Sequence, residues 1–220
     1  MKINEMNIVI TGANGAVASN LISFFLEKAA SVTGTVRKID RNIEDTSNNI
    51  IEMDPLNNYS IEKGIDCINN KVGIIHCWFN IVGGFSMGRR VETGLEEWSY
   101  MYNTNFMTAL NCCQQILSKM KENNWGRIIN MGAQVAIKGM ALTGPYCSSK
   151  TSVHMLTKII ALENGNEITC NAILPGIIST PKNQKEMPSV DQKDWTSIES
   201  IALKIEDLLL SKENGQLIHL

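Results

Sequence analysis

Two residues whose side chains can exchange a proton lie one helical turn apart in the middle of the chain. Tyr146 and Lys150 form a Y-x-x-x-K pattern, and an i, i+4 spacing places both side chains on one face of a helix. A phenol with its usual pKa near ~10 is a poor acid at neutral pH. A neighbouring ammonium stabilises the phenolate and lowers that pKa. The pair is therefore suited to general acid–base chemistry.

A glycine-rich turn lies near the start of the chain. Gly12, Gly15 and Ala18 follow a G-x-x-G-x-x-A spacing after an apolar strand and at the start of a predicted helix. Glycine lets the backbone approach a pyrophosphate, and the helix N-terminus offers free N–H groups. The position of the turn favours dinucleotide binding over an ordinary strand–helix connection. The residues predicted to contact the dinucleotide here are Thr11, Gly12, Asn14, Gly15, Ala16 and Val17.

The end of the second predicted strand indicates which dinucleotide is bound. An acidic residue there would accept a hydrogen bond from a ribose 2′-hydroxyl, whereas an arginine accommodates a 2′-phosphate. The strand ends in Arg37 and Lys38, with Asp40 slightly further on. NADP(H) is therefore the favoured cofactor and NAD(H) the alternative. The other interpretation is that both cations are solvated surface charges.

Residues after the third and fourth strands are expected to complete the adenosine end of the site. Asp54 is placed to accept a hydrogen bond from the adenine amino group. The segment containing Asn80, Val82 and Gly83 would bring backbone against the ribose. A nicotinamide held beside Tyr146 would then supply the hydride that accompanies the proton.

The elements that must position these residues alternate between apolar strands and amphipathic helices. The predicted strands are 6–11, 32–37, 50–53, 73–79, 127–131, 168–174 and 216–220. The predicted helices are one that ends near residue 30, then 56–69, 94–123, 148–163 and 198–210, with a loop over 175–195. Apolar strands alternating with helices imply an α/β fold, a doubly wound parallel sheet of the Rossmann type in three αβα layers. The length of 220 residues suits a single domain over 1–220.

The composition narrows the class of protein. Charged residues make up 19% and the net charge is −2, so no electrostatic footprint for nucleic acid stands out. No apolar run is long enough to span a bilayer, and no signal peptide is recognised, so a cytoplasmic protein is expected. The six cysteines form no C-x-x-C pair, which predicts reduced thiols and no metal site. His76 and His154 are interpreted as structural.

Over nearly its whole length the sequence resembles the short-chain dehydrogenase/reductase family. The matching residues are 11–18 (TGANGAVA), Asp54, 80–84 (NIVGG), Asn105, 127–132 (RIINMG), Tyr146, Lys150 and 174–181 (LPGIISTP). The resemblance implies that Lys150 also binds the nicotinamide ribose and that Asn105 helps to hold a proton-relay water. The alternative for Asn105 is a helix-surface or capping role. The resemblance also extends the cofactor contacts to Pro175, Gly176, Ile178 and Thr180 and implies a homodimer or homotetramer.

One position departs from the family pattern. The family usually carries a serine thirteen residues before the tyrosine, and this chain has Ala133. Loss of a donor to a developing oxyanion typically costs about 2.7–4 kcal/mol of transition-state stabilisation. Either Tyr146 acts alone, or Gln134 substitutes, or the substrate develops no localised alkoxide.

The third option points to the quinonoid dihydropteridine reductase branch, which the chain resembles in several details. The shared features are the G-x-x-G-A loop, Ala133, the segment Thr180–Pro181, Asn183, Met187–Pro188, Asp191 and Trp195, and the run 215–218. Asn80 and Asn105 look like the broader family instead, and Arg37 replaces an acidic residue of that branch.

The loop over about 176–197 should cover the nicotinamide end of the site. The residues predicted to form a compact, mostly apolar substrate pocket are Phe85, Gln134, Met140, Met187 and Trp195. The alternative for each is core packing. Two functions follow: an NAD(P)H-dependent reductase of a small carbonyl or quinonoid substrate, or a non-catalytic dinucleotide-binding redox sensor. Ala133 favours the sensor, whereas Tyr146 and Lys150 favour the enzyme.

Overall fold

The computed structural model describes residues 1–28, 31–39, 49–88 and 90–220. In this part of the chain seven parallel strands form one sheet, in the order β3-β2-β1-β4-β5-β6-β7. The strands are β1 (Asn7–Thr11), β2 (Ser31–Val36), β3 (Ile50–Glu52), β4 (Cys77–Asn80), β5 (Gly126–Met131), β6 (Ile168–Leu174) and β7 (Leu217–His219). The strand order reverses between β1 and β4, the point at which such sheets bind ligands beyond the carboxyl ends of their strands.

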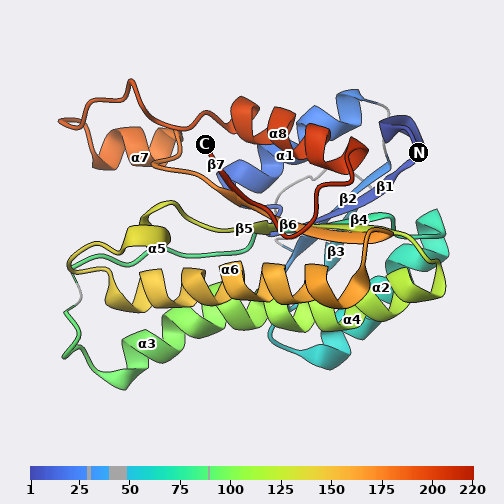
Figure 1. The fold of residues 1–220 in the computed structure, drawn as a ribbon, viewed down its shortest axis with the longest axis horizontal. Helices are drawn as coiled ribbons and strands as arrows, with labels where there is room; N and C mark the ends of the chain where they lie inside the picture. Colours follow the sequence, from blue (N-terminus) through green and yellow to red (C-terminus); the bar gives the residue numbers. More distant parts are fainter. Residues whose placement is uncertain (29–30, 40–48, 89) are drawn as a thin grey trace.

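Helices cover both faces of the sheet (Figure 1). On one face lie α1 (Ala16–Glu27) and α8 (Ile198–Leu210), and on the other lie α2 (Asn58–Val72), α4 (Thr108–Glu122) and α6 (Gly144–Asn164). In β1, Ile8 and Ile10 pack in the same core as residues of α1 and α8, whereas Val9 packs in the core beneath α2 and α4. Successive side chains of a strand point to opposite faces, so both faces are buried. The predicted three-layer α/β architecture is confirmed.

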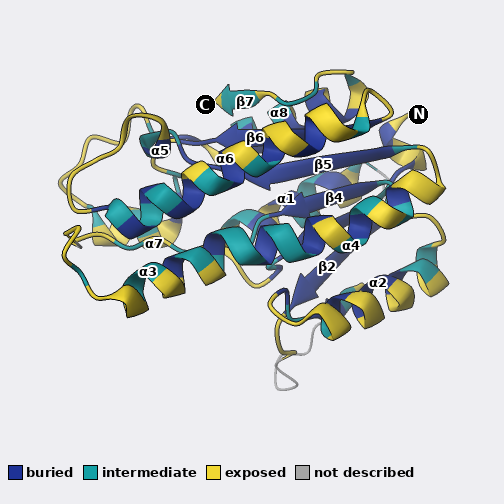
Figure 2. Cartoon of the chain, turned by 60° about the horizontal axis from the view of Figure 1, so that its bottom comes forward, coloured by how far each residue is buried: buried dark blue, intermediate teal, exposed yellow. Residues whose placement is uncertain are grey.

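The burial pattern follows from this layering (Figure 2). Strands β4, β5 and β6 are buried along their whole lengths, and the helices turn exposed faces outward. In α1 the buried side chains are Ala18, Leu21 and Phe25, which recur every three or four residues as an amphipathic helix requires. None of the helices in the described part of the chain is both long and apolar enough to cross a membrane. All six cysteines are unpaired, and only Cys67 is exposed.

Helix α6 begins at Gly144 rather than at the predicted Ser148. Pro145 lies in its first turn, where the missing N–H of proline costs no hydrogen bond and its fixed φ suits the helix. Tyr146 therefore belongs to the first turn of α6, and Lys150 lies one turn further along the same helix.

The predicted helix over 94–123 is divided into three parts. Helix α3 (Leu95–Met101) is followed by a π-helical segment, Tyr102–Met107, and then by α4. A π-helical turn holds an extra residue, which shifts the face that each side chain presents, and such turns are frequent at functional sites. The segment contains Asn105, which is buried.

Other boundaries differ because local hydrogen bonds override the hydrophobic pattern. The predicted loop over 175–195 contains a short helix, α7 (Pro181–Glu186), in which the Thr180 hydroxyl accepts the Asn183 N–H. A second short helix, α5 (Val135–Lys138), follows β5. The predicted strand over 73–79 begins only at Cys77, and the preceding His76 accepts the Asn7 N–H on its Nδ1 at 3.0 Å.

Candidate active site

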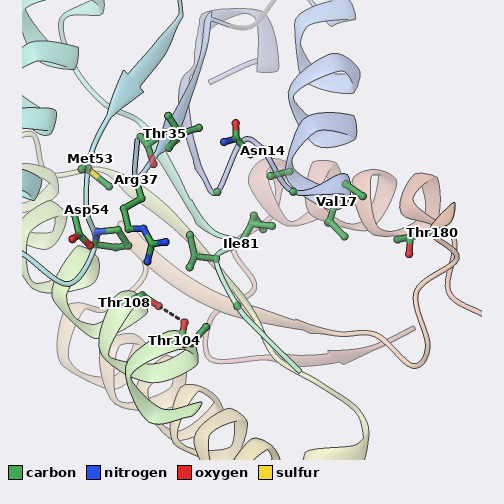
Figure 3. A pocket seen from close by; sticks show the side chains of 18 of the residues that line it. Asn14, Val17, Thr35, Arg37, Met53, Asp54, Ile81, Thr104, Thr108 and Thr180 are labelled. Carbon is green, nitrogen blue, oxygen red and sulfur yellow. Dashed lines mark hydrogen bonds between the residues drawn. The ribbon is translucent and has the colours of Figure 1, made fainter. Parts of the chain in front are cut away.

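A cavity of about 580 Å³ opens at the carboxyl ends of the strands around the switch point (Figure 3). Its walls come from the β1–α1 loop, the ends of β2 and β3, the segment after β4, and the stretch around Thr180. The predicted cofactor residues that line it are Gly12, Asn14, Gly15, Ala16, Val17, Arg37, Asp54, Val82, Gly83, Ile178 and Thr180. Segments far apart in sequence therefore meet at one cavity, as the strand order predicts.

The glycine turn is shaped by a close backbone approach. Gly12 has a φ of +77°, and a Cβ built on it would lie 3.1 Å from Val82 Cγ2. The N–H groups of Gly12 and Ala13 both donate to the Thr35 carbonyl at 2.9 Å. The turn is thereby fixed against both β2 and the segment after β4, and only glycine fits at this position without strain.

The start of α1 offers an electropositive wall to this cavity. The N-cap is Gly15, which has no side chain to cap the helix. The first N–H groups of a helix have no intrahelical partner and carry the positive end of its dipole. Ala16 and Val17 of this first turn line the cavity, so the geometry suits an anionic group such as a pyrophosphate.

The two ends of the cavity differ in chemistry. Figure 3 shows Arg37 beside Asp54 at one end, and Val17 and Thr180 at the other. The Asp54 carboxylate accepts the Leu56 N–H at 3.0 Å, which fixes it at the rim. One end thus presents a cation and a carboxylate, and the other presents the helix start and a hydroxyl.

One of the charged residues considered for cofactor binding does not face this cavity. Arg37 and Lys38 are both exposed, but only Arg37 lines the cavity. Asp40 lies outside the described residues. Of the two cations that follow β2, Arg37 is therefore the one that lines this cavity.

Thr11 and Asn80 support the cavity from beneath rather than lining it. The Thr11 hydroxyl accepts the Ile81 N–H at 3.0 Å and donates to the Phe79 carbonyl at 3.2 Å. The Asn80 amide is buried and donates to Asn130 Oδ1 at 2.8 Å. Both side chains hold the end of β4 in place, and we had expected both to contact the dinucleotide.

Asn105 joins the segment after β4 to α6. Its Oδ1 accepts the Gly84 N–H at 2.8 Å, and its Nδ2 donates to the Gly84 carbonyl at 3.1 Å and to Ser149 Oγ at 3.0 Å. The residue is 1% exposed. The alternative interpretation of Asn105 as a surface residue is therefore wrong.

Lys150 lies in the same cluster. Its Nζ donates to the Met131 carbonyl at 2.7 Å. A Cβ on Gly83 would lie 2.9 Å from Asn105 Oδ1 and 3.2 Å from Lys150 Nζ, so both polar groups approach the Gly83 backbone. Burial lowers the pKa of Lys150 to about 8, because the protonated amine has lost most of its contact with water.

Tyr146 is half-buried beside this cluster. Its ring packs edge-to-face against Phe85, with 4.9 Å between the ring centroids. Burial raises the pKa of Tyr146, and the neighbouring Cys147 adds to the rise. The expectation that Lys150 lowers this pKa does not hold here, because desolvation of the phenol is the larger effect. Tyr146 is therefore a neutral phenol at neutral pH, which is the proton-donating form.

No side-chain hydroxyl stands at the position where the family usually has serine. Ala133 is buried, and its N–H donates to His154 Nε2 at 3.2 Å. Burial, followed by the nearby Lys150, lowers the pKa of His154 to about 4, so its neutral ring can accept this bond. Gln134 Nε2 donates to the Leu220 carbonyl at 2.7 Å, which directs the amide away from the role of a substitute donor.

The remaining predicted residues are more dispersed. Pro175 and Gly176 do not line the cavity, and the Gly176 N–H donates to Thr196 Oγ1 at 3.1 Å. The predicted substrate residues Phe85, Gln134, Met140, Met187 and Trp195 also lie outside it. Of these five, Phe85 contacts the Tyr146 ring.

Comparison with known proteins identifies the family. Residues 6–191 match the family model described as short chain dehydrogenase. The chain belongs to this family. It is an oxidoreductase of the short-chain dehydrogenase class, as the sequence motifs predict.

Three relatives share 28% identity or less with this chain. An uncharacterised oxidoreductase, YvrD, from Bacillus subtilis (strain 168) is 28% identical over 189 residues, which are 80% of this chain and 70% of YvrD. Among solved structures, ElxO with NADP bound has a TM-score of 0.88 at 24% identity and covers 100% of this chain and 97% of its own. NAD+-bound xylitol dehydrogenase has a TM-score of 0.88 at 19% identity, with coverages of 100% and 99%. At these identities the structural matches show the shared fold alone.

In this short-chain dehydrogenase the sequence motifs did not predict all the residues that line the cavity. The lining residues not predicted include Thr35, Met53, Thr104, Thr108, Lys182 and Asn183. Thr104 lies in the π-helical segment and Thr108 is the first residue of α4, and this break in the helix leaves no clear sequence signal. Lys182 follows the Thr180–Pro181 pair directly and lies in the first turn of α7, a helix that was expected to be a loop.

Proposed function

We propose that the chain transfers a hydride between a nicotinamide dinucleotide and a small carbonyl or quinonoid substrate, with Tyr146 as the general acid and base. The observation that carries the proposal is the meeting of Asn105 and Lys150 at Gly83. Gly83 also lines the cavity that contains the glycine turn. Lys150, the proposed partner of the proton-transfer group Tyr146, therefore adjoins a candidate dinucleotide site.

The residues that line the cavity fit a nicotinamide dinucleotide. Gly12 provides the close approach that a pyrophosphate needs, and the first turn of α1 provides unpaired N–H groups. Arg37 at the far end favours a 2′-phosphate and so NADP(H), and Asp54 would bind the adenine. NAD(H) remains the alternative. Of the similar structures, ElxO has NADP bound and xylitol dehydrogenase has NAD+ bound.

Each residue of the catalytic cluster has a distinct part in the proposed mechanism. The bound, reduced nicotinamide would supply the hydride. Tyr146 would donate its phenolic proton to the substrate oxygen, so that C=O becomes CH–OH, and would take the proton back in the reverse direction. Lys150, as an ammonium, would stabilise the phenolate left behind. Asn105 would hold the segment after β4 against α6 and, by family resemblance, support a proton-relay water.

A second candidate substrate class is favoured by Ala133. A localised alkoxide would need a donor that this position lacks, and Gln134 donates to Leu220 instead. A quinonoid acceptor spreads its developing charge over a conjugated ring and needs such a donor less. Reduction of a quinonoid dihydropterin is therefore kept as an alternative within the same mechanism.

The test is consumption of NADPH and NADH with a panel of quinonoid dihydropterin, quinones, 3-oxoacyl thioesters and simple ketones. We expect turnover with at least one class, and we expect Tyr146→Phe to lower the rate by about 10²–10⁴. Unchanged turnover in Tyr146→Phe would defeat the mechanism. Dinucleotide binding without turnover of any class would favour the redox sensor instead.

We further propose that all 220 residues form one domain that works in the cytoplasm as a homodimer or homotetramer. The exposed apolar side chains Met155, Ile159 and Leu162 on α6 support self-association. Met101 in α3 is buried and cannot contribute to such a surface. Light scattering of the purified protein measures the subunit count directly, and a monomer at micromolar concentration would contradict it.

A further inference from the structure

The carbonyl of Leu220 is held by three donors from separate parts of the chain. Gln134 Nε2 lies 2.7 Å from it, Thr196 Oγ1 lies 3.0 Å from it, and the Gly176 N–H donates to it at 3.3 Å. These residues follow β5, precede α8 and follow β6 respectively. We call this set, with Leu220, the Leu220 clamp.

Thr196 closes the base of the predicted substrate loop. Its N–H donates to the Ile177 carbonyl, and its own carbonyl accepts the Ser179 N–H, both at 2.8 Å. Its hydroxyl also accepts the Gly176 N–H at 3.1 Å. Because Thr196 is 5% exposed, water competes little for these bonds. The two ends of the segment 177–196 are therefore joined at one residue, and the Leu220 carbonyl is bonded to its hydroxyl.

Gln134 connects the clamp to the wall beside the catalytic tyrosine. It follows Ala133 directly, and its backbone N–H donates to the Pro175 carbonyl at 3.0 Å. The backbone of Gln134 thus fixes the start of the segment that carries Thr180 and Lys182 into the cavity. Its side chain bonds the Leu220 carbonyl rather than projecting toward a substrate.

We propose that Gln134 and Thr196 are positioning residues that act through the Leu220 carbonyl. They anchor the segment 177–196 so that Thr180, and with it Lys182, lies against the dinucleotide. Loss of either donor leaves the Leu220 carbonyl with one side-chain partner fewer and releases the base of the segment. The effect on cofactor affinity rests on the proposed function, whereas the anchoring itself does not.

Two pairs of variants separate the clamp from general destabilisation. Thr196→Val removes the hydroxyl at nearly constant volume, and its matched control is Thr33→Val in β2, where the side chain is also 5% exposed. Gln134→Met removes the amide, and its control is Gln115→Met, another half-buried glutamine, in α4. Thr196→Ser keeps the hydroxyl and serves as the rescue variant.

The first readout is independent of activity. Trypsin can cut after Lys182, Lys185 and Lys193, which are all exposed within the segment. We expect Thr196→Val and Gln134→Met to be cut there about tenfold faster than the wild type, while Thr196→Ser and both controls resemble it. Equal cleavage rates in all variants would overturn the clamp. If Thr196→Val fails to fold, Gln134→Glu, which places an acceptor against the carbonyl, gives the same comparison.

The second readout is a fluorescence titration with NADPH, combined with steady-state kinetics. We expect the two clamp variants to bind NADPH about tenfold more weakly, with a raised KM for NADPH and a kcat within about twofold of the wild type. Unchanged affinity in both variants would refute the positioning role. If the wild type binds neither NADPH nor NADH, the proposed function fails, and the proteolysis comparison still decides the clamp.

Discussion

At the scale of single residues, burial moves the pKa values of the proposed catalytic pair, Tyr146 and Lys150, in opposite directions. It raises the pKa of Tyr146 and lowers that of Lys150 to about 8. A neutral phenol is the form that donates a proton, and the raised pKa makes the phenolate that remains more costly to form. Lys150 then has to be protonated at the moment when the phenolate forms. This requirement gives the enzyme a pH dependence with a defined sign.

The rate of reduction should fall as the pH rises through about 8, because Lys150 loses the charge that stabilises the phenolate. The measurement is kcat/KM against pH with the best substrate of the panel. Loss of activity only on the acid side of pH 7 would contradict the assignment.

The same group makes a separate contribution to stability. The folded protein holds the Lys150 proton less tightly than the unfolded chain does, so the unfolded chain binds more protons between pH 8 and pH 10.5. The contribution of Lys150 to the free energy of unfolding should therefore increase across this window. Lys150→Met should lack that increase, which urea titrations of both proteins at several pH values will show.

Ala133 decides which substrates the proposed site serves best. Ala133→Ser restores the usual hydroxyl, and we expect it to raise kcat/KM for simple ketones by about 10²-fold, since such a donor is worth about 2.7–4 kcal/mol. For a quinonoid acceptor, whose charge is delocalised, the change should stay within about threefold. Ala136→Ser, in the same small apolar cluster, is the matched control. Equal gains for both substrate classes would remove the argument for a conjugated substrate.

At the scale of elements, the turn between β1 and α1 depends on one backbone conformation. In Gly12→Ala, a left-handed φ costs roughly 1–2 kcal/mol, and the new Cβ would also lie 3.1 Å from Val82 Cγ2. We expect NADPH affinity to fall tenfold or more, or about 1.4 kcal/mol. The measurement is a binding titration alongside thermal unfolding.

Gly73→Ala is the control for this prediction. Gly73 has a φ of +76°, and a Cβ on it would meet nothing within 4 Å. It therefore also has a positive φ, which disfavours alanine, but it has no such contact and does not line the cavity. Both variants should lose stability, and only Gly12→Ala should lose affinity. Equal losses of affinity would show that the turn contributes through general stability alone.

At the scale of the whole molecule, the sequence predicted the layers well because strands that are apolar on both faces leave few other arrangements. The strand β6 and the helix α8 have the predicted bounds. The glycine turn and the Tyr146–Lys150 pair were also predictable, since their chemistry depends on short local spacings. The errors fall into two groups. The start of α6 and the helix α7 depend on local features, namely Pro145 and the Thr180 cap. The raised pKa of Tyr146 and the bond from Gln134 to Leu220 depend on the packing of the folded chain.

Long-range contacts also account for a buried polar network in the middle of the sheet. Asn80 Oδ1 accepts the Trp78 indole N–H at 2.9 Å, and Asn80 donates to Asn130 at 2.8 Å. Asn130 in turn donates to Thr157 Oγ1 at 2.9 Å and is 0% exposed. Strands β4 and β5 and helix α6 are thereby joined below the catalytic cluster. Removing one member leaves its partners buried and unpaired, which costs more than the bond itself contributes.

Asn130→Ala should therefore lower the free energy of unfolding by about 2–4 kcal/mol. The double variant with Asn80→Ala should be less destabilised than the sum of the two single variants, because the second substitution removes a group that the first had already left unpaired. Urea denaturation of all four proteins measures this coupling. Asn20→Ala, at an exposed position of α1, should change stability by less than about 0.5 kcal/mol. Strict additivity of the two core substitutions would mean that the network is a set of independent contacts and does not couple the sheet to the catalytic helix.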